Sequence, residues 1–64
     1  YHRHGDAGAA SLAAGEYSLL IGQAEDARLH AGRAEREYAE GSPGWLRAQD
    51  IRQEAVQLIA LQQR

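Results

Sequence analysis

The sequence predicts an all-α fold, in which two antiparallel helices form a hairpin and a third helix packs against the pair. Thirteen of the 64 residues are Ala, the strongest helix former, whereas the β-branched and aromatic residues that favour strands are scarce. A break of sequence Gly-Ser-Pro-Gly at 41–44 separates the last helix from the rest. We therefore expect one domain over residues 6–64, preceded by a disordered lead-in at residues 1–5.

The first helix is predicted at residues 7–21. Asp6 is a suitable N-cap, because its carboxylate can accept hydrogen bonds from the N–H groups of the first turn. Gly8 and Gly15 each weaken the helix by about 1 kcal/mol relative to Ala, and a glycine retained in mid-helix often marks the close approach of another backbone. Gly22 occupies the position where a left-handed residue closes the last turn.

The second helix is predicted at residues 24–39. One of its faces is narrow and mostly built from small side chains, which lets a neighbouring helix approach closely. This face consists of Ala27, Ala31, Ala34 and Tyr38. We expect Gly15 and Ala27 to face each other where the first two helices cross. The residues predicted to pack the hairpin are Gly15, Gly22, Ala27, Ala31 and Ala34.

The third helix is predicted at residues 43–62. Gly41 is expected to end the second helix, Ser42 to cap the third, and Pro43 to occupy its first turn. Val56 and Leu61 lie off the main apolar face, and they are either a second contact surface or ordinary exposed apolar residues. The main face, which we expect to cover the hairpin, carries Trp45, Ala48, Ile51, Ala55, Leu58 and Ile59.

The charge pattern indicates a solvated surface rather than a nucleic-acid interface. The formal net charge is −2, and all seven basic residues are Arg. Arg and Glu alternate along the second helix, as in the spaced pairs Arg33–Glu37 and Arg36–Glu40. A nucleic-acid-binding protein would instead carry a one-sided basic stripe. No apolar run approaches the ~20 residues of a membrane span, so we expect neither a nucleic-acid partner nor a membrane segment in this chain.

No residues of the chain form a catalytic or metal-binding pattern. The sequence lacks an HExxH motif, a GxSxG motif, a phosphate-binding glycine loop and a Cys nucleophile. His2 and His4 could share a metal ion, but a disordered tail is the simpler interpretation. Carboxylates are numerous, yet acid–base catalysis needs an enclosed pair with separated pKa values. We therefore expect no catalytic, cofactor-binding or metal-binding residue here and no enzyme activity from this chain.

The spacing of the small residues resembles a tetratricopeptide repeat (TPR), a helical hairpin of about 34 residues. The matching positions are Gly15, Gly22, Ala27 and Ala34, which correspond to the first-helix glycine, the turn glycine and two second-helix alanines of the repeat. The chain departs from the repeat at Ala14, where Leu is common, and at Ser18 and Ala31, where bulky side chains are usual. The proline expected near the end of the second helix is displaced to Pro43.

A longer run, GEYSLLIGQAEDARLHAGRAEREYAEGSPGWLRAQDI at 15–51, resembles the C-terminal TPR-like region of bacterial zinc metallopeptidases of the HtpX/BepA-like class. In those proteins a similar hairpin is followed by a short loop and a helix that opens with a segment like WLRAQDI, residues 45–51 here. The resemblance covers residues 7–51. It implies that this chain is the C-terminal adaptor of such a peptidase, which gates the active site or docks polypeptide substrates and partner proteins.

The same resemblance implies that the zinc ligands and the catalytic Glu belong to an upstream domain, so that none of them is carried by a residue of this chain. It also implies a periplasmic or membrane-associated location. Because the chain begins at Tyr1, we expect it to be a piece of a longer protein.

The alternative is a structural module without a peptidase parent, a helical hairpin whose third helix drives self-association. The chain has few large apolar side chains and no Cys, so a core of this size leaves a monomer short of stability. We therefore expect contact with a polypeptide, with the parent peptidase domain or with further copies of the chain. In a homo-oligomer, Val56 and Leu61 are expected at or near the contact. An HExxH motif immediately upstream in the reading frame would distinguish the two interpretations.

Overall fold

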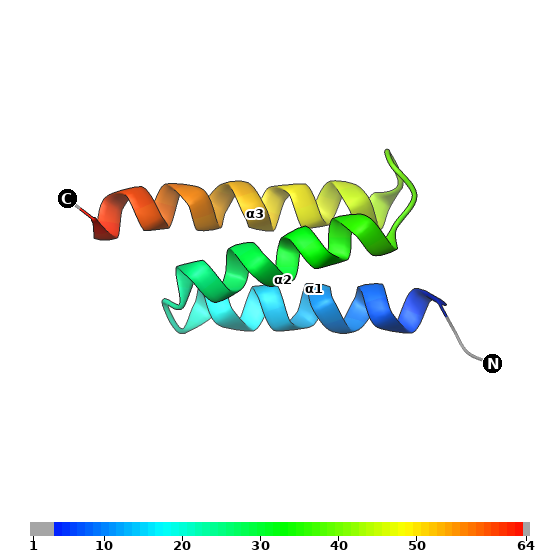
Figure 1. Ribbon diagram of the computed structural model, residues 1–64, viewed down its shortest axis with the longest axis horizontal. Coiled ribbons are helices and arrows are strands. Elements are labelled where there is room, and N and C mark those ends of the chain that lie inside the picture. Colours follow the sequence, from blue (N-terminus) through cyan, green and yellow to red (C-terminus); the bar gives the residue numbers. More distant parts are fainter. Residues whose placement is uncertain (1–3, 64) are drawn as a thin grey trace.

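In the computed structural model, three α-helices succeed one another along the chain (Figure 1). They are α1 at His4–Leu20, α2 at Ala24–Glu37 and α3 at Pro43–Gln62. The structure describes the backbone of residues 4–63 and the side chains of residues 7–63, and no strand occurs in that part of the chain. The predicted all-α fold, a hairpin with a third packed helix, is confirmed.

Helix α1 begins earlier than predicted, at His4 rather than at residue 7. Asp6 therefore lies inside the helix and not at its N-cap, and residues 4 and 5 are helical rather than a disordered lead-in. Asp is favoured within a first turn as well as at a cap, and the alanine-rich segment that follows supports a helix on both sides of it. The remaining lead-in, residues 1–3 with His2, lies outside the described residues.

Most of the predicted helix boundaries are confirmed, among them the start of α2 at Ala24. Gly22 has a φ of +80°, and its N–H donates to the carbonyl of Leu19 at 3.1 Å, which closes the end of α1. At the start of α3, the Oγ of Ser42 accepts a hydrogen bond from the N–H of Trp45 at 3.3 Å, and Pro43 is the first helical residue. Helix α3 ends at Gln62, as predicted.

Helix α2 ends at Glu37, two residues earlier than predicted. Tyr38 has extended backbone angles (φ −106°, ψ 151°), although its N–H still donates to the carbonyl of Ala34 at 3.2 Å. Gly41 therefore does not end the helix. It has a φ of +84° in the turn that leads to α3. The early end directs the chain away from the α2 axis at Tyr38.

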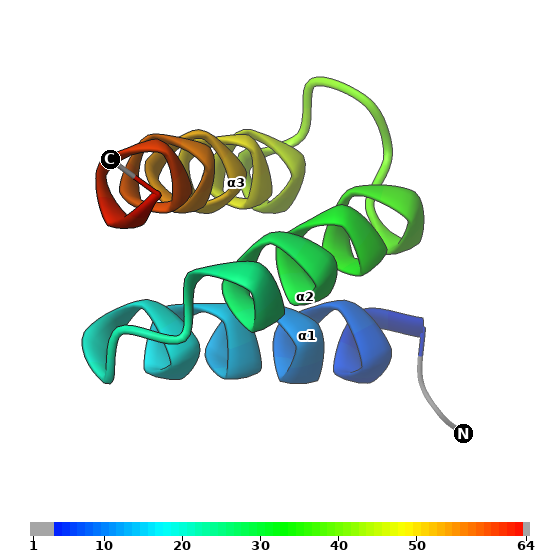
Figure 2. The same ribbon diagram turned by 60° about the vertical axis from the view of Figure 1, so that its left-hand side comes forward.

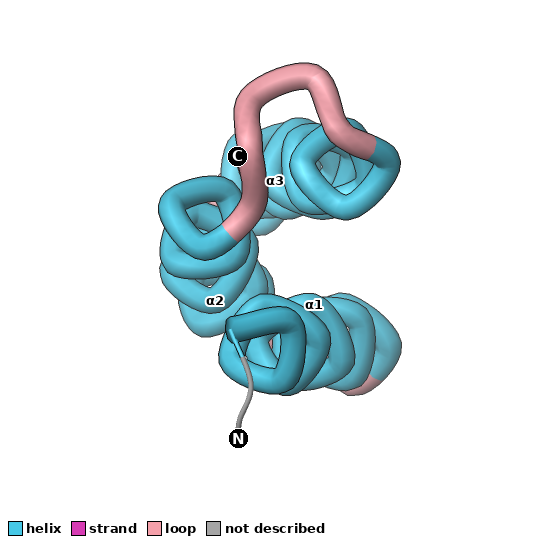
Figure 3. The backbone as a smooth tube through the Cα atoms, turned by 90° about the vertical axis from the view of Figure 1, so that its right-hand side faces the viewer, coloured by secondary structure: helices cyan, strands magenta, loops and turns pink. Residues whose placement is uncertain are grey.

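Helix α2 lies between the other two helices and packs against both of them, whereas α1 and α3 contact each other less extensively (Figures 1 and 2). Seen end on, the three helices form a C, with α2 at the back and α1 and α3 as the two arms (Figure 3). The Cα atoms extend over 44 × 21 × 13 Å. The Cα cylinder of one helix is about 4.6 Å wide and packed helix axes lie ~8–10 Å apart, so the shortest dimension holds two layers of helix and a large part of each helix stays exposed.

The core is built from small side chains. Ile51 is the one large apolar side chain that is fully buried among the described residues. Trp45, Leu58 and Ile59, which were predicted to cover the hairpin, are half-buried. Small interior side chains allow helix axes to approach closely, because the separation of two helices depends on the side chains at the contact. The other buried apolar residues are Ala24, Ala27, Ala31, Ala34, Ala48 and Ala55.

The predicted charge pairs along α2 are replaced by a contact between helices. Neither Arg33–Glu37 nor Arg36–Glu40 forms an ion pair within the described residues, and Glu40 lies beyond the end of α2, where helical spacing no longer applies. Arg52 of α3 reaches across to α2, and its Nε lies 2.7 Å from Oε2 of Glu35. This ion pair joins α2 to α3.

Candidate interaction groove

Gly15 lies at the point where all three helices meet. A Cβ atom added to Gly15 would lie 3.6 Å from the carbonyl oxygen of Ala27 and 3.3 Å from Cγ2 of Ile51. The side chains of Ala27 and Ile51 are buried completely or almost so. A larger side chain at position 15 or 27 would therefore have to push the helices apart.

The buried residues of α1 and α2 share one spacing, and together they form what we call the small-residue seam. Steps of three, four and three residues separate the members of each run. With Gly15 beside Ala27 in an antiparallel pair, each buried residue of α1 lies level with a buried residue of α2. The seam consists of Gly8, Ser11, Gly15 and Ser18 on α1 and of Ala24, Ala27, Ala31 and Ala34 on α2.

Gly22 does not belong to the small-residue seam, which corrects its predicted role in helix packing. A Cβ atom added to Gly22 would meet no atom within 4 Å. The position needs glycine because its φ of +80° is unfavourable for residues with a side chain. The carbonyl of Gly22 accepts a hydrogen bond from Nε2 of Gln62 at 3.2 Å. This bond joins the turn between α1 and α2 to the C-terminal end of α3.

Tyr38 has a packing role that the sequence did not reveal. Its ring lies between two glycines from different helices. A Cβ atom added to Gly8 of α1 would lie 2.7 Å from Cε2 of the ring, and one added to Gly44 of α3 would overlap the other edge at Cε1 and Cδ1. The ring fits between α1 and α3 because neither helix has a side chain at these two positions. The only signal in the sequence is the pair of glycines, which does not identify the aromatic partner.

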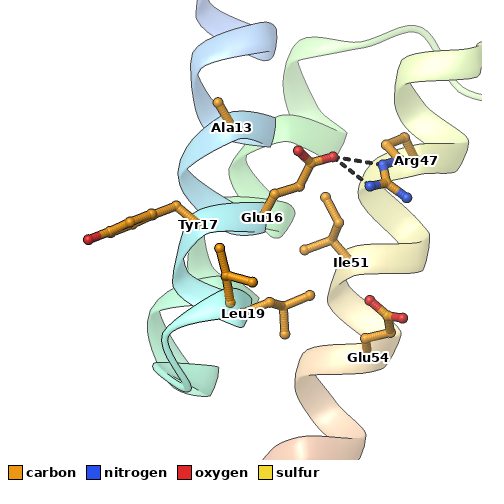
Figure 4. Close-up of a pocket in the computed structure, with 8 residues that line it drawn as sticks. Ala13, Glu16, Tyr17, Leu19, Arg47, Ile51 and Glu54 are labelled. Atoms are coloured by element: carbon orange, nitrogen blue, oxygen red, sulfur yellow. Dashed lines mark hydrogen bonds and ion pairs between the residues drawn. The ribbon is translucent and has the colours of Figure 1, made fainter.

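An open groove of about 580 Å³ runs between the two arms of the C, with walls supplied by α1 and α3 alone (Figure 4). Ile51 points from the α3 wall toward α1, and Tyr17 lies on the rim with its ring directed away from α3 (Figure 4). The apolar part is exposed, since Tyr17 and Leu20 retain 62% and 84% of their accessible surface. The lining residues are Ala13, Glu16, Tyr17, Leu19, Leu20, Arg47, Ile51 and Glu54.

An ion pair links the two walls of the groove. The Nε and Nη2 atoms of Arg47 lie 2.8 Å and 2.6 Å from Oε2 of Glu16. This hydrogen bond, together with the charge of the carboxylate, raises the pKa of Arg47 above its ordinary value. Glu54, on the α3 wall, is the second carboxylate of the groove. Glu16 and Glu54 together with Arg47 give the groove one net negative charge.

The groove continues toward the C-terminal end of α3. This continuation has a volume of about 320 Å³ and shares Leu19 and Glu54 with the first part. Leu61 lines it together with Leu58, whereas Val56 lines neither part. Five residues at 100° each place Val56 and Leu61 about 140° apart around α3. The expectation that they share one contact surface is therefore corrected: Leu61 belongs to the groove and Val56 to the opposite flank.

Among the described residues, no three His, Cys, Asp or Glu side chains lie together as a metal site would require. His2, which was considered as a ligand of a metal ion shared with His4, lies outside those residues, and the side chain of His4 does too. The helices of the same region are too short or too polar to cross a membrane.

The fold and the groove define a three-helix, all-α domain with an open, largely apolar surface between two of its helices. Comparison of the chain with protein-family models, with curated proteins and with solved structures finds no match. Its function is therefore inferred from the geometry of the groove and from the sequence pattern.

Proposed function

We propose that this chain is a non-catalytic, TPR-like protein-interaction domain, which binds a polypeptide segment in the groove between α1 and α3. The observation that carries the proposal is the groove itself, in which apolar side chains are accompanied by an ion pair and one further carboxylate. Concave apolar surfaces with a few polar groups are typical of binding sites. Exposed apolar patches with a polar rim commonly mark protein–protein contacts.

The arrangement of the helices supports the TPR-like part of the proposal. Helices α1 and α2 form a hairpin, and α1 and α3 line the inner side of the C while α2 forms its back (Figure 3). Stacked helix pairs of repeat proteins present such concave surfaces to their ligands. Ser18 stands where the repeat usually has a bulky residue, and it is buried in the small-residue seam. The hairpin of this chain is accordingly packed with smaller side chains than a typical repeat.

The parent protein in this proposal is a bacterial zinc metallopeptidase of the HtpX/BepA-like class, in which this chain is the C-terminal adaptor. Support comes from the sequence run at 15–51 and from the helix that opens with WLRAQDI. The zinc ion would be held by the upstream catalytic domain. The role of the adaptor would be to dock a polypeptide substrate or to cover the active site of that domain.

The groove favours one class of ligand, an amphipathic helix with a basic residue. An apolar stripe at helical spacing would cover Leu19 and Leu20, as in other helix-in-groove complexes. A Lys or Arg beside that stripe would complement Glu54, because the carboxylates of Glu16 and Glu54 outnumber the one guanidinium of the groove. A basic amphipathic segment is therefore the partner that we expect.

Groove binding is tested with Leu19→Glu. Leu19 is half-buried on the α1 wall and lines both parts of the groove, so loss of this apolar side chain should weaken binding of a basic amphipathic helical peptide at least about tenfold. The measurement is calorimetric titration with such a peptide. Leu29→Glu, the same change on the exposed outer side of α2, is the matched control and should leave the affinity unchanged. Equal losses in the two variants would exclude the groove as the binding site.

The competing function is a structural module that associates with itself and has no peptidase parent. The apolar outer side of α1, on which Tyr17, Leu20 and Ile21 are exposed, favours it. An HExxH motif in the reading frame immediately upstream would support the adaptor. Its absence, together with self-association of the chain, would support the structural module.

The proposed adaptor should hydrolyse no polypeptide and should hold no stoichiometric zinc on its own. The reason is that the sequence has no ligand set at the spacing of a zinc site. Elemental analysis of the tag-free chain and a casein hydrolysis assay provide the measurements. One tightly held zinc ion per chain would contradict the prediction.

A further inference from the structure

Helix α1 has a second apolar face, on the side opposite to the small-residue seam. Its large members, Tyr17, Leu20 and Ile21, are 62%, 84% and 50% exposed. Glu16 is the only charged residue between positions 7 and 21. A helix that is apolar on all sides is normally buried on all sides. We call this surface the outer face of α1, and it consists of Ala9, Ala10, Ala13, Tyr17, Leu20 and Ile21, all of them exposed.

Large apolar side chains are also exposed on α2 and α3, but on the outer side of α2 Leu29 is the one such residue among those described. The exposed residues of this side also include Glu25, Asp26, Arg33 and Glu37, which suit contact with water. The contrast between the two helices marks the outer face of α1 as the surface that needs a partner.

Side-chain size along the outer face is graded. The three alanines come first, at residues 9–13, and the three large side chains follow at residues 17–21, with Ile21 directly after the end of α1. The two groups are arranged symmetrically about residue 15, because 9 and 21, 10 and 20, and 13 and 17 are equally far from it. When two copies of such a helix pair in antiparallel orientation about a two-fold axis level with residue 15, each alanine meets a large side chain of the second copy.

We propose that the outer face of α1 is a homodimer interface, in which two copies of the chain pair antiparallel through α1. An isologous contact must be complementary to itself, and the graded face satisfies this requirement. The face itself carries no charged side chain, and Glu16, which lies beside it near the axis, has its charge compensated by Arg47 of the same copy. A parallel pair would set Tyr17 against Tyr17 and Leu20 against Leu20 and would leave gaps between the alanines.

The expected dimer is weak. Helix α1 has 17 residues and is therefore about 25 Å long. One pair of helices of that length buries less than the ~1,600 Å² of a standard protein interface. A dissociation constant in the micromolar range follows, so the measurements should extend to several hundred micromolar chain.

Cysteine cross-linking tests the orientation directly, because the chain contains no cysteine of its own. Ala10→Cys and Leu20→Cys are prepared as separate variants. In the antiparallel dimer, position 10 of one copy lies level with position 20 of the other, whereas the two copies of position 10 are about 15 Å apart along the helix. A disulfide requires Cα atoms within about 7 Å. The mixture should therefore form a disulfide-linked dimer, while each variant alone should not.

The dimer is tested independently by analytical ultracentrifugation of Ala10→Glu. This change should raise the dissociation constant at least tenfold, because it places a carboxylate against Leu20 of the second copy. Ala60→Glu, the same change at an exposed alanine of α3, is the matched control and should dimerise like the unmodified chain. Circular dichroism verifies that both variants remain helical.

Three results would overturn the proposal: a concentration-independent monomer, self-cross-linking of Ala10→Cys alone, or equal effects of Ala10→Glu and Ala60→Glu. The first would leave the outer face to another segment of polypeptide. Ala13, Tyr17 and Leu20 belong to both the outer face and the groove, so a dimer of this kind would cover part of the α1 wall of the groove. The two proposals are still tested separately, since Ala10 does not line the groove and Leu19 is not part of the outer face.

Discussion

Replacement of Ala27 by Leu should lower the free energy of unfolding by about 1–3 kcal/mol, the usual effect of overpacking a well-packed core. Ala27 is fully buried, and its backbone lies against Gly15 where α1, α2 and α3 meet. Three additional carbon atoms cannot enter this space unless α1 and α2 move apart. Because the small-residue seam extends along both helices, such a shift would also disturb Ala31 and Ala34.

The neighbouring substitution Arg28→Leu is the control for Ala27→Leu. Arg28 forms a surface ion pair with Glu25 one turn away, and its side chain is 41% exposed. Loss of an exposed pair of this kind changes stability by less than about 1 kcal/mol. Thermal and urea unfolding of both variants gives the comparison. Equal stabilities would mean that α1 and α2 do not pack through Ala27.

The position of the small-residue seam could be predicted from the sequence, because spacing is a one-dimensional property. Gly15 in mid-helix and alanines at helical spacing predicted a close contact between Gly15 and Ala27. In the structure, a Cβ atom added to Gly15 would lie 3.6 Å from the Ala27 carbonyl oxygen. The start of α3 was equally predictable, because Ser42 and Pro43 act within one turn of their own positions.

The position of Tyr38 could not be predicted in the same way. Helical spacing assigned it to the face of Ala27, Ala31 and Ala34, yet α2 ends one residue before it. The ring instead lies between Gly8 and Gly44, which are distant from each other in the sequence. A contact of this kind depends on how three helices are arranged in space, and local propensity contains no information about that arrangement.

The groove could likewise be recognised only in the structure and not from the sequence. The spacing of Val56 and Leu61 already places them on different sides of α3, but the sequence did not show which of them lies toward α1. The structure shows that Leu61 lines the continuation of the groove together with Leu19 of α1, whereas Val56 lines neither part. The ion pair Glu16–Arg47 connects helices whose relative positions the sequence did not define.

The contact between Tyr38 and the two glycines predicts that Gly44→Ala lowers the free energy of unfolding, although helix propensity alone predicts an increase. Gly44 lies in the first turn of α3, where replacement of Gly by Ala would by helix propensity alone stabilise the chain by up to ~1 kcal/mol. The added Cβ of Gly44→Ala would overlap the Tyr38 ring, which cannot retreat because Gly8 lies on its other edge. We therefore expect Gly44→Ala to destabilise the chain by about 1–3 kcal/mol.

Gly32→Ala is the matched control, because a Cβ at this position of α2 would meet no atom within 4 Å. It should raise the free energy of unfolding by up to ~1 kcal/mol. Tyr38→Ala should lower it by about 2 kcal/mol, less than the ~3–5 kcal/mol of a fully buried aromatic residue, because Tyr38 is half-buried.

The double variant Tyr38→Ala, Gly44→Ala completes the cycle of urea unfolding measurements. Once the ring is absent, the Cβ at position 44 has free space, and the same Gly44→Ala change should become neutral or stabilising. This reversal of sign would show direct coupling between the two positions, since independent sites give additive effects. If Gly44→Ala stabilises the chain while Tyr38 is present, the ring does not occupy the space between α1 and α3, and the early end of α2 needs another cause.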